Sequence, residues 1–352
     1  MKILVIQQKM IGDVLVSSII CNNLRSAYPN AQIDYLIYPF TAPVVENNPN
    51  INRILLFKDQ YRTSKKALFQ FLLTIRKEQY DLVMDAYGKV ESRLVVAFSG
   101  AKKKIGFHKP FRNFVYTETV QELTIPNTNA GLAIENRLNL LNPLHLDITL
   151  DNRPKIFLTD IEIAKGKEIL SQHEVDLTKK VYMIGVLGSG TNKTYPFPYM
   201  SAVLDAIVAQ TGATLLFNYM PSQQKEAQEI FDFCQPNTQR NIKITLIPGS
   251  IREFLSITYH CNALIGNEGG AVNMAKAMNK PTFTIFSTWI IKEAWSFFED
   301  GKTHVSVHLK DFKPELYGAK SAKEMKQDAL ELYHYFTPDL WLSELENYLQ
   351  IN

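Results

Sequence analysis

The stretch LIGNEGGAVNMAKAMNKPTFTIFS, Leu264–Ser287, predicts how this chain folds. Its short apolar start leads into the turn Asn267–Gly270, where two glycines permit positive φ and close approach of a ligand to the backbone. Val272, Ala275 and Met278 then have the spacing of one helix face, and an apolar run rich in β-forming residues follows. This order of strand, turn, helix and strand is typical of a parallel α/β sheet.

The polar turn in this stretch is a candidate binding site. Open α/β sheets bind anionic ligands at the carboxyl ends of their strands, where helix N-terminal N–H groups point at the ligand. Glu268 is the carboxylate of this turn. Two interpretations stay open from the stretch alone: Glu268 caps the helix that follows, or it contacts a ligand.

Length and composition indicate a soluble globular protein with two domains. The chain has 352 residues, of which 46% are hydrophobic and 21% are charged. A net charge of +3 gives no argument for nucleic acid as a partner. The three cysteines lie far apart, so we expect reduced thiols in a cytoplasmic protein. No apolar run resembles a signal peptide or reaches the length of a membrane span.

Strands and helices alternate along the whole chain, which predicts doubly wound parallel sheets. We expect strands at 2–7, 33–37, 53–57, 81–85, 103–107, 155–158, 181–187, 214–217, 242–247, 263–266, 282–287 and 304–309. We expect helices at 13–27, 64–77, 91–98, 160–172, 198–210, 222–234, 251–261, 271–278, 322–336 and 338–349.

Asp13 stands at the start of the first expected helix, directly after Gly12. The free N–H groups and the dipole of a helix N-terminus favour a carboxylate there, so an N-cap role accounts for it. The same groups would hold it ionised, which suits a general base, and Gly12 would let a substrate approach the backbone. The turn lacks the GxGxxG fingerprint, so a dinucleotide is not predicted there.

The turn Gly188–Lys193, GSGTNK, follows a buried strand in the second half. Its small residues and hydroxyls expose backbone N–H groups, and Lys193 adds a positive charge, which together suit a diphosphate. The spacing of a P-loop is absent. A plain surface turn remains the alternative.

Basic and aromatic residues interleave in the first half of the chain. They form either solvated surface positions or a surface for an anionic, partly apolar acceptor such as a phosphorylated lipid at a membrane face. The basic residues are Arg53, Lys58, Arg62, Lys65, Lys66, Lys102, Lys103, Lys104, Lys109 and Arg112, and the aromatic ones are Tyr61, Phe69, Phe107, Phe111 and Phe114.

Four segments of the chain, taken in order, resemble the ADP-heptose:lipopolysaccharide heptosyltransferase family, glycosyltransferase family 9. They are MIGDVL at 10–15, YDLVMDAYG at 80–88, GSGTNKTYP at 188–196 and IGNEGGAVNMAKAMNKPTFTIF at 265–286. The resemblance implies the GT-B arrangement, in which two Rossmann-like doubly wound domains face each other across a cleft. It implies an acceptor domain at 1–155, a connection at 156–180, a nucleotide-sugar domain at 181–336, and a last helix at 337–352 that can return to the first domain.

The same resemblance implies site residues. Asp13 matches the family's base, and Lys193 matches its phosphate-binding lysine, which places both among the catalytic residues. The family's Asp-x-Gly-x-x-His pattern falls on Glu268, Gly270 and Asn273. The side chain that carries the carboxylate is thus one methylene longer than aspartate, and asparagine, which cannot become a cation, replaces the histidine. The donor-binding positions are Gly12, Ser189, Gly190, Thr191, Gln224, Gly249, Glu268, Gly269, Gly270 and Asn273.

The resemblance therefore implies a cytoplasmic, inverting glycosyltransferase, metal-independent and without a cofactor, that contacts the inner face of the membrane. Its partners would be an ADP-linked nucleotide sugar carrying heptose or a related sugar, and an anionic glycolipid resembling the lipopolysaccharide core. No metal-ligand spacing stands out. A non-catalytic relative that binds the same ligands and a dinucleotide-dependent enzyme remain the alternatives.

Overall fold

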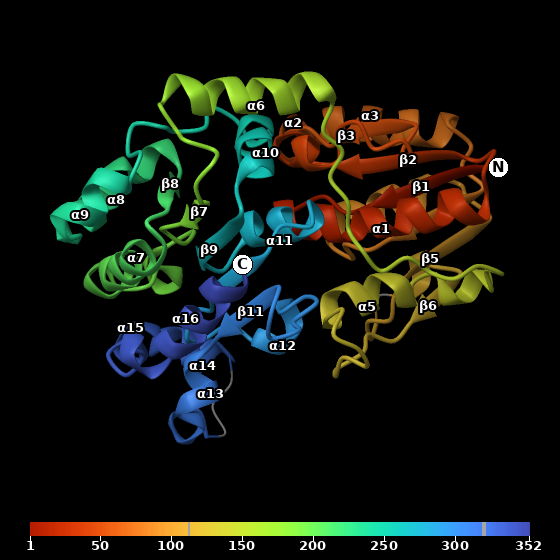
Figure 1. The fold of residues 1–352 in the computed structure, drawn as a ribbon. Coiled ribbons are helices and arrows are strands. Elements are labelled where there is room, and N and C mark those ends of the chain that lie inside the picture. The colour runs from red at the N-terminus through yellow and green to blue at the C-terminus, as the bar shows by residue number, and fades with distance from the viewer. Residues whose placement is uncertain (112, 319–321) are drawn as a thin grey trace. The chain divides into compact units, whose positions relative to one another are not determined.

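The computed structural model describes residues 1–111, 113–318 and 322–352, and Arg112, one of the basic residues named above, lies outside them. Contacts within the chain divide it into two compact units, Met1–Phe157 and Leu158–Asn352. Every strand pairing between named strands in the described residues is parallel. Each unit is an α/β domain in which helices connect successive strands (Figure 1).

The sheet of the first unit has the strand order β3-β2-β1-β4-β5-β6. This is the strand order of the dinucleotide-binding fold. From β1 the chain first adds strands on one side of the sheet and then, from β4, on the other. Sheets of this kind bind their ligands at this topological switch point between β1 and β4. The central strand β1 reads KILVI and is buried on both faces, as its continuous apolar run predicts. The strands are β1 Lys2–Ile6, β2 Gln32–Ile37, β3 Arg53–Leu56, β4 Leu82–Asp85, β5 Lys103–Phe107 and β6 Glu118–Val120.

Helix α1 follows β1 and is buried on nearly all sides from Val14 to Leu24. It packs against β2 on one side and α5 on another. A helix enclosed in this way cannot shift without disturbing the core, so its first turn is held firmly. The helices are α1 Ile11–Ala27, α2 Gln60–Thr63, α3 Lys65–Lys77, α4 Val90–Phe98 and α5 Leu132–Asn139, with 3₁₀ turns at Pro39–Val44, Asn113–Val115 and Asn142–Leu144.

The sheet of the second unit has the order β11-β10-β9-β7-β8. The order in which strands are added changes sides between β7 and β9. This topological switch point is where a sheet of this kind binds its ligand. The strands are β7 Val181–Gly185, β8 Thr214–Asn218, β9 Ala263–Asn267, β10 Thr282–Ile285 and β11 His304–Val307.

Aromatic residues from the end of the chain fill the core of the second unit. The Trp341 ring lies 5.6 Å from Phe283 and 5.9 Å from Tyr195, measured between centroids. Helix α16 packs against α7. The helices are α6 Asp160–Gln172, α7 Phe197–Thr211, α8 Gln224–Phe233, α9 Pro236–Asn241, α10 Ile251–His260, α11 Gly270–Ala277, α12 Lys292–Trp295, α13 Leu309–Phe312, α14 Ala322–Gln327, α15 Ala329–Tyr333 and α16 Leu342–Ile351, with 3₁₀ turns at Thr191–Lys193, Pro221–Gln223, Pro314–Leu316 and Pro338–Leu340.

Helix α6 lies in the segment 156–180, expected as a connection, and it belongs to the second unit. It lies side by side with α10 (Figure 1). A Cβ atom at Gly166 would stand 2.3 Å from the backbone oxygen of Ser256, so glycine is what allows the two helices to approach this closely. An ion pair between Glu162 and Arg252, 2.7 Å long, fastens the same two helices.

Two expected strands are wrong. Residues 155–158 have no strand partner in the described chain. Residues 242–247 form a single bridge, from Ile242 to Leu215, after which the Leu246 N–H donates to the Lys243 carbonyl and the chain turns away. Alternating apolar residues form a strand only where a neighbouring edge stays within reach.

Strand β6 and helix α5 were not expected from the sequence, and two expected helices each consist of separate elements. The helix expected over 322–336 is broken at Asp328 into α14 and α15, and the helix expected over 338–349 begins as a 3₁₀ turn. Helix α5 is only eight residues long, which leaves a weak periodic signal.

Candidate functional site

The second unit brings two predicted site residues together at its switch point. Lys193 lies in the turn after β7, and Glu268 lies in the turn after β9. The Lys193 ammonium nitrogen is 2.9 Å from Glu268 Oε1, and it lies 5.4 Å from the centre of the Trp289 ring. Their side chains are 27% and 10% exposed. A half-buried cation thus stands where an open α/β sheet binds anions.

Asn267 ties the two turns to each other, and sequence analysis did not single it out. Its amide oxygen accepts from the Tyr195 N–H at 2.7 Å, and its amide nitrogen donates to the carbonyls of Gly185 at 2.9 Å and Val186 at 3.0 Å. The residue is 4% exposed. An asparagine at the end of a buried apolar run was the available signal, because a polar side chain in that position needs partners.

Glycine is required at two points where the backbones meet. A Cβ atom at Gly188 would stand 2.2 Å from the Lys193 carbonyl oxygen, so this turn closes on itself. Gly266 has φ +132°, and a Cβ atom there would stand 2.5 Å from the Gly185 carbonyl oxygen. The tight turns that present Lys193 and Glu268 therefore follow from glycines in the sequence.

The loop after β10 supports the turn that carries Lys193. The hydroxyl of Ser287 donates to the Asn192 carbonyl at 2.7 Å, and the indole N–H of Trp289 donates to the same oxygen at 3.0 Å. Lys326, from α14, lies 5.0 Å from the Trp289 ring centre. Two ammonium groups thus lie near one indole ring, which adds to the positive character of this end of the sheet.

Of the other predicted donor-binding residues, Gly12 lies in α1 of the first unit, and several of the rest lie on the two turns that carry Lys193 and Glu268. Ser189 and Thr191 are exposed on the same turn as Lys193, and Asn273 stands in the first turn of α11 behind Gly270. Gly190 and Thr191 line a cavity of about 330 Å³ together with Gln223, Glu226 and Tyr333.

Of the predicted donor-binding residues, only Gly190 and Thr191 line that cavity. Gln224 begins α8 beside it, and its neighbours Gln223 and Glu226 contribute to the lining instead. Gly249 precedes Ser250, which caps α10 by accepting from the Glu253 N–H at 3.1 Å. The roles of Gln224 and Gly249 in donor binding stay predictions.

In the first unit Asp13 is the third residue of α1, and the residue at the N-cap is Met10. Asp13 Oδ1 accepts from Arg137 Nη2 at 2.9 Å, and Oδ2 accepts a longer bond of 3.4 Å from the Met10 N–H. Burial raises the pKa of Asp13 above its ordinary value, while the Arg137 charge opposes this effect. Sequence analysis missed Arg137, because it lies on the unpredicted helix α5.

Asp85 occupies the other side of the first switch point, at the end of β4. Its carboxylate accepts from the backbone N–H groups of Tyr87 and Gly88 at 3.0 and 2.9 Å. The hydroxyls of Ser92 and Tyr116 each donate to it at 2.8 Å. Because its oxygens are occupied by the protein, Asp85 shapes the turn at 86–88 and is not available as a base.

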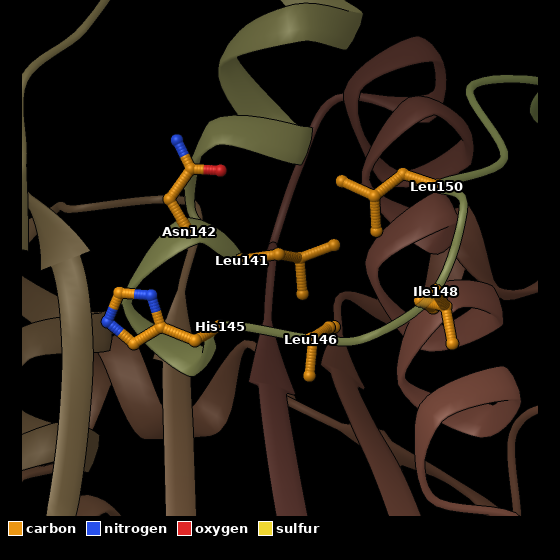
Figure 2. Close-up of a pocket in the computed structure, with 6 residues that line it drawn as sticks. All are labelled: Leu141, Asn142, His145, Leu146, Ile148 and Leu150. Carbon is orange, nitrogen blue, oxygen red and sulfur yellow. The ribbon is translucent and has the colours of Figure 1, made fainter.

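A second cavity, of about 370 Å³, lies in the first unit, and none of the predicted site residues lines it. Figure 2 shows Asn142 and His145 at one side, Ile148 and Leu150 at the other, and two leucines between them. The aliphatic residues are Leu141, Leu146, Ile148 and Leu150.

The basic and aromatic residues of the first half do not all reach the surface. Phe69, Phe111 and Phe114 are exposed, whereas Phe107 is buried and Tyr61 stacks on Phe71 with ring centres 4.5 Å apart. Within the described residues, no group of three His, Cys, Asp or Glu side chains is arranged to hold a metal ion. No described helix combines the length and apolar content needed to cross a membrane.

A family model for glycosyltransferase family 9 (heptosyltransferase) matches residues 68–315, more than half of the chain. The chain belongs to this family. Lipopolysaccharide heptosyltransferase 3 of Escherichia coli is 23% identical over 285 residues, covering 78% of this chain and 80% of that protein. This glycosyltransferase family 9 protein is therefore an enzyme of glycosyl transfer, as its sequence predicts.

Solved structures share its fold. The glycosyl transferase family 9 protein from Veillonella parvula DSM 2008 matches with a TM-score of 0.73 at 16% identity, covering 95% of this chain and 97% of that one. E. coli ADP-heptose lps heptosyltransferase II matches with a TM-score of 0.68 at 14% identity, covering 95% and 99%. The predicted fold class, two Rossmann-like domains of the GT-B type, is confirmed.

Proposed function

We propose that this family 9 glycosyltransferase moves heptose or a related sugar from an ADP-linked donor to a glycolipid resembling the lipopolysaccharide core, with inversion at the anomeric carbon. The donor named for the similar E. coli structure is ADP-heptose. The observation that supports the proposal most is the position of Lys193. Its ammonium nitrogen lies 2.9 Å from Glu268 Oε1, at the switch point of the second sheet.

The second unit binds the donor in this proposal. The diphosphate lies at the turn 188–193, where Lys193, the hydroxyls of Ser189 and Thr191 and free backbone N–H groups contact it. These groups stabilise the negative charge that grows on the diphosphate as it leaves, without help from a metal ion. Glu268, Gly270 and Asn273 contact the sugar, and the longer carboxylate adapts the site to the sugar transferred.

The first unit supplies the base. Asp13 removes the proton of the acceptor hydroxyl while the acceptor oxygen attacks the anomeric carbon from the side opposite the diphosphate. The bond from that carbon to the diphosphate oxygen breaks, ADP leaves, and the configuration inverts. Proton transfer to a positioned carboxylate supplies roughly 10²–10⁴-fold in rate. The acceptor is a glycolipid, and the enzyme meets it at the inner face of the membrane.

A thermal-shift panel tests the proposal, with ADP, ADP-heptose and GDP-, UDP- and CDP-sugars side by side and NAD as a control. A donor at about 100 times its dissociation constant should add roughly 2.7 kcal/mol to the free energy of unfolding. We expect the largest shift with the ADP-linked sugar, followed by sugar transfer to a core-like acceptor. A shift with NAD alone would overturn the proposal, and donor binding without transfer to any core-like acceptor would indicate a non-catalytic relative.

A further inference from the structure

We propose that Arg137 is the positioning residue of Asp13. It holds the carboxylate through Oδ1, so that Oδ2 is the oxygen that receives the proton of the acceptor. This inference rests on the proposed role of Asp13 as the base.

The contacts of Arg137 fix both the place and the plane of its guanidinium group. Nη2 donates to Asp13 Oδ1 at 2.9 Å, and Nε donates to the Ser17 hydroxyl at 3.1 Å. Asp13 and Ser17 lie one helical turn apart on α1, so one planar group spans two points of the same helix face. The Arg137 side chain is 14% exposed, which leaves it little freedom to leave this position.

The network continues from Ser17 into the turn that precedes Asp13. The Ser17 hydroxyl donates to Gln7 Oε1 at 3.4 Å, and Gln7 Nε2 donates to the Lys9 carbonyl at 2.6 Å. Ser17 and Gln7 are buried. Arg137 is thus joined to both ends of the segment that carries the base, the turn after β1 and the first turns of α1.

Helix α5, which carries Arg137, is itself anchored by a carboxylate two residues earlier. Glu135 accepts from the backbone N–H groups of Asn127 and Thr128 at 2.7 and 2.6 Å, and from the Thr128 hydroxyl at 2.7 Å. Burial would raise the pKa of Glu135, but these hydrogen bonds outweigh it and lower the pKa. The helix that presents Arg137 to α1 is therefore fixed at its start.

Charge supports the same assignment. Burial raises the pKa of Asp13, and the charge and hydrogen bond of Arg137 lower it. Tyr35 and Tyr87 also interact electrostatically with Asp13, yet burial raises the pKa of Tyr35 well above its ordinary value and that of Tyr87 to about 12, so both stay neutral. Arg137 therefore opposes the effect of burial and favours the ionised carboxylate that a base requires.

The test compares Arg137→Gln, Arg137→Lys and Ser17→Ala. The pKa of Asp13 is measured by ¹³C NMR on protein labelled at aspartate, with the Asp13 carboxyl signal identified by its loss in Asp13→Asn. The kcat and the KM of each substrate are measured across pH. Arg137→Lys keeps the charge and Ser17→Ala keeps the whole guanidinium group, so a folding failure of one variant does not end the experiment.

We expect Arg137→Gln to raise the pKa of Asp13 and so to move the acid limb of the pH profile of kcat to higher pH. The same change should lower kcat by about 10²-fold and leave the KM of the donor unchanged. Arg137→Lys should restore the pKa and part of kcat, and Ser17→Ala should lower kcat without moving the limb. An unchanged Asp13 pKa in a folded Arg137→Gln protein would overturn the inference. Because NMR reads the carboxyl directly, a raised pKa without any change in kcat would instead contradict Asp13 as the base.

Discussion

Lys193 and Glu268 form an ion pair, 2.9 Å long, between the turn after β7 and the turn after β9. The proposed diphosphate site thus contains an anion of the protein next to its cation. A diphosphate that binds Lys193 competes with the Glu268 carboxylate and is repelled by it. Glu268 is therefore expected to weaken the binding of ADP, although its proposed role is to contact the sugar of the full donor.

Lys193→Ala and Glu268→Gln should change ADP affinity in opposite directions. Removing the cation should weaken ADP binding, and neutralising the carboxylate should strengthen it, each by about tenfold, which corresponds to 1.4 kcal/mol. ADP lacks the sugar, so it isolates this charge effect. Calorimetric titration measures both constants, with the exposed Lys225→Ala as the control. Weaker ADP binding by Glu268→Gln would mean that Glu268 supports the nucleotide itself.

Asp13→Asn should abolish most turnover and leave donor affinity nearly unchanged. Asparagine keeps the shape of the side chain but cannot accept a proton near neutral pH, so kcat should fall by roughly 10²–10⁴-fold. A transfer assay gives kcat, and titration with ADP gives the affinity. The exposed Asp147→Asn should behave as wild type. Turnover near the wild-type rate would remove Asp13 from the mechanism.

The positions of Lys193 and Glu268 could be predicted from the sequence because they depend on local features. Continuous apolar runs mark β7 and β9, and the glycine-rich turns that follow them contain Lys193 and Glu268. The order of strands in a parallel sheet then brings the two turns together.

The contact between Arg137 and Asp13 could not be read in the same way. It joins residues 124 positions apart, and it depends on a helix too short to show a clear period. The strand expected at 242–247 fails for a related reason, since its pattern is correct but the chain turns away after Ile242. Local pattern predicts elements, whereas contacts between distant segments decide which of them form and where they meet.

The ion pair between Glu162 and Arg252 should make the junction of α6 and α10 sensitive to acid. Hydrogen bonds from Arg252 hold the pKa of Glu162 at about 2, against an ordinary 4.5. A carboxyl whose pKa is lowered by folding stabilises the folded protein at pH values above its pKa in the unfolded chain. The contribution of Glu162 to stability is therefore complete above pH 4.5 and is lost as the pH falls through about 2.

Arg252→Met should therefore lower the melting temperature at pH 7 by a few degrees, because a partly solvated pair contributes about 1 kcal/mol or less. The difference from wild type should shrink as the pH falls toward the pKa of Glu162. Thermal unfolding at a series of pH values measures it, and the exposed Arg240→Met serves as the control. A difference that does not depend on pH would show that packing of the arginine, and not its charge, holds the two helices.

Asn267→Ala should affect both stability and nucleotide binding. The change leaves the Tyr195 N–H without a partner and removes a donor from the buried carbonyls of Gly185 and Val186. An unpaired buried group costs about 1–3 kcal/mol, so the melting temperature should fall clearly. ADP affinity should fall as well, because the turn that carries Lys193 loses its connection to the turn that carries Glu268.

Asn262 offers a matched control at the opposite end of the same pair of strands. Its side-chain oxygen accepts from the Val181 N–H at 2.8 Å, and the residue is exposed. Asn262→Ala should lower stability slightly, because water can replace its bond, and it should leave ADP affinity unchanged. If both variants weakened ADP binding in proportion to their loss of stability, Asn267 would be a residue of the fold alone. A loss of affinity confined to Asn267→Ala would show that one buried amide keeps the two turns of the proposed donor site in register.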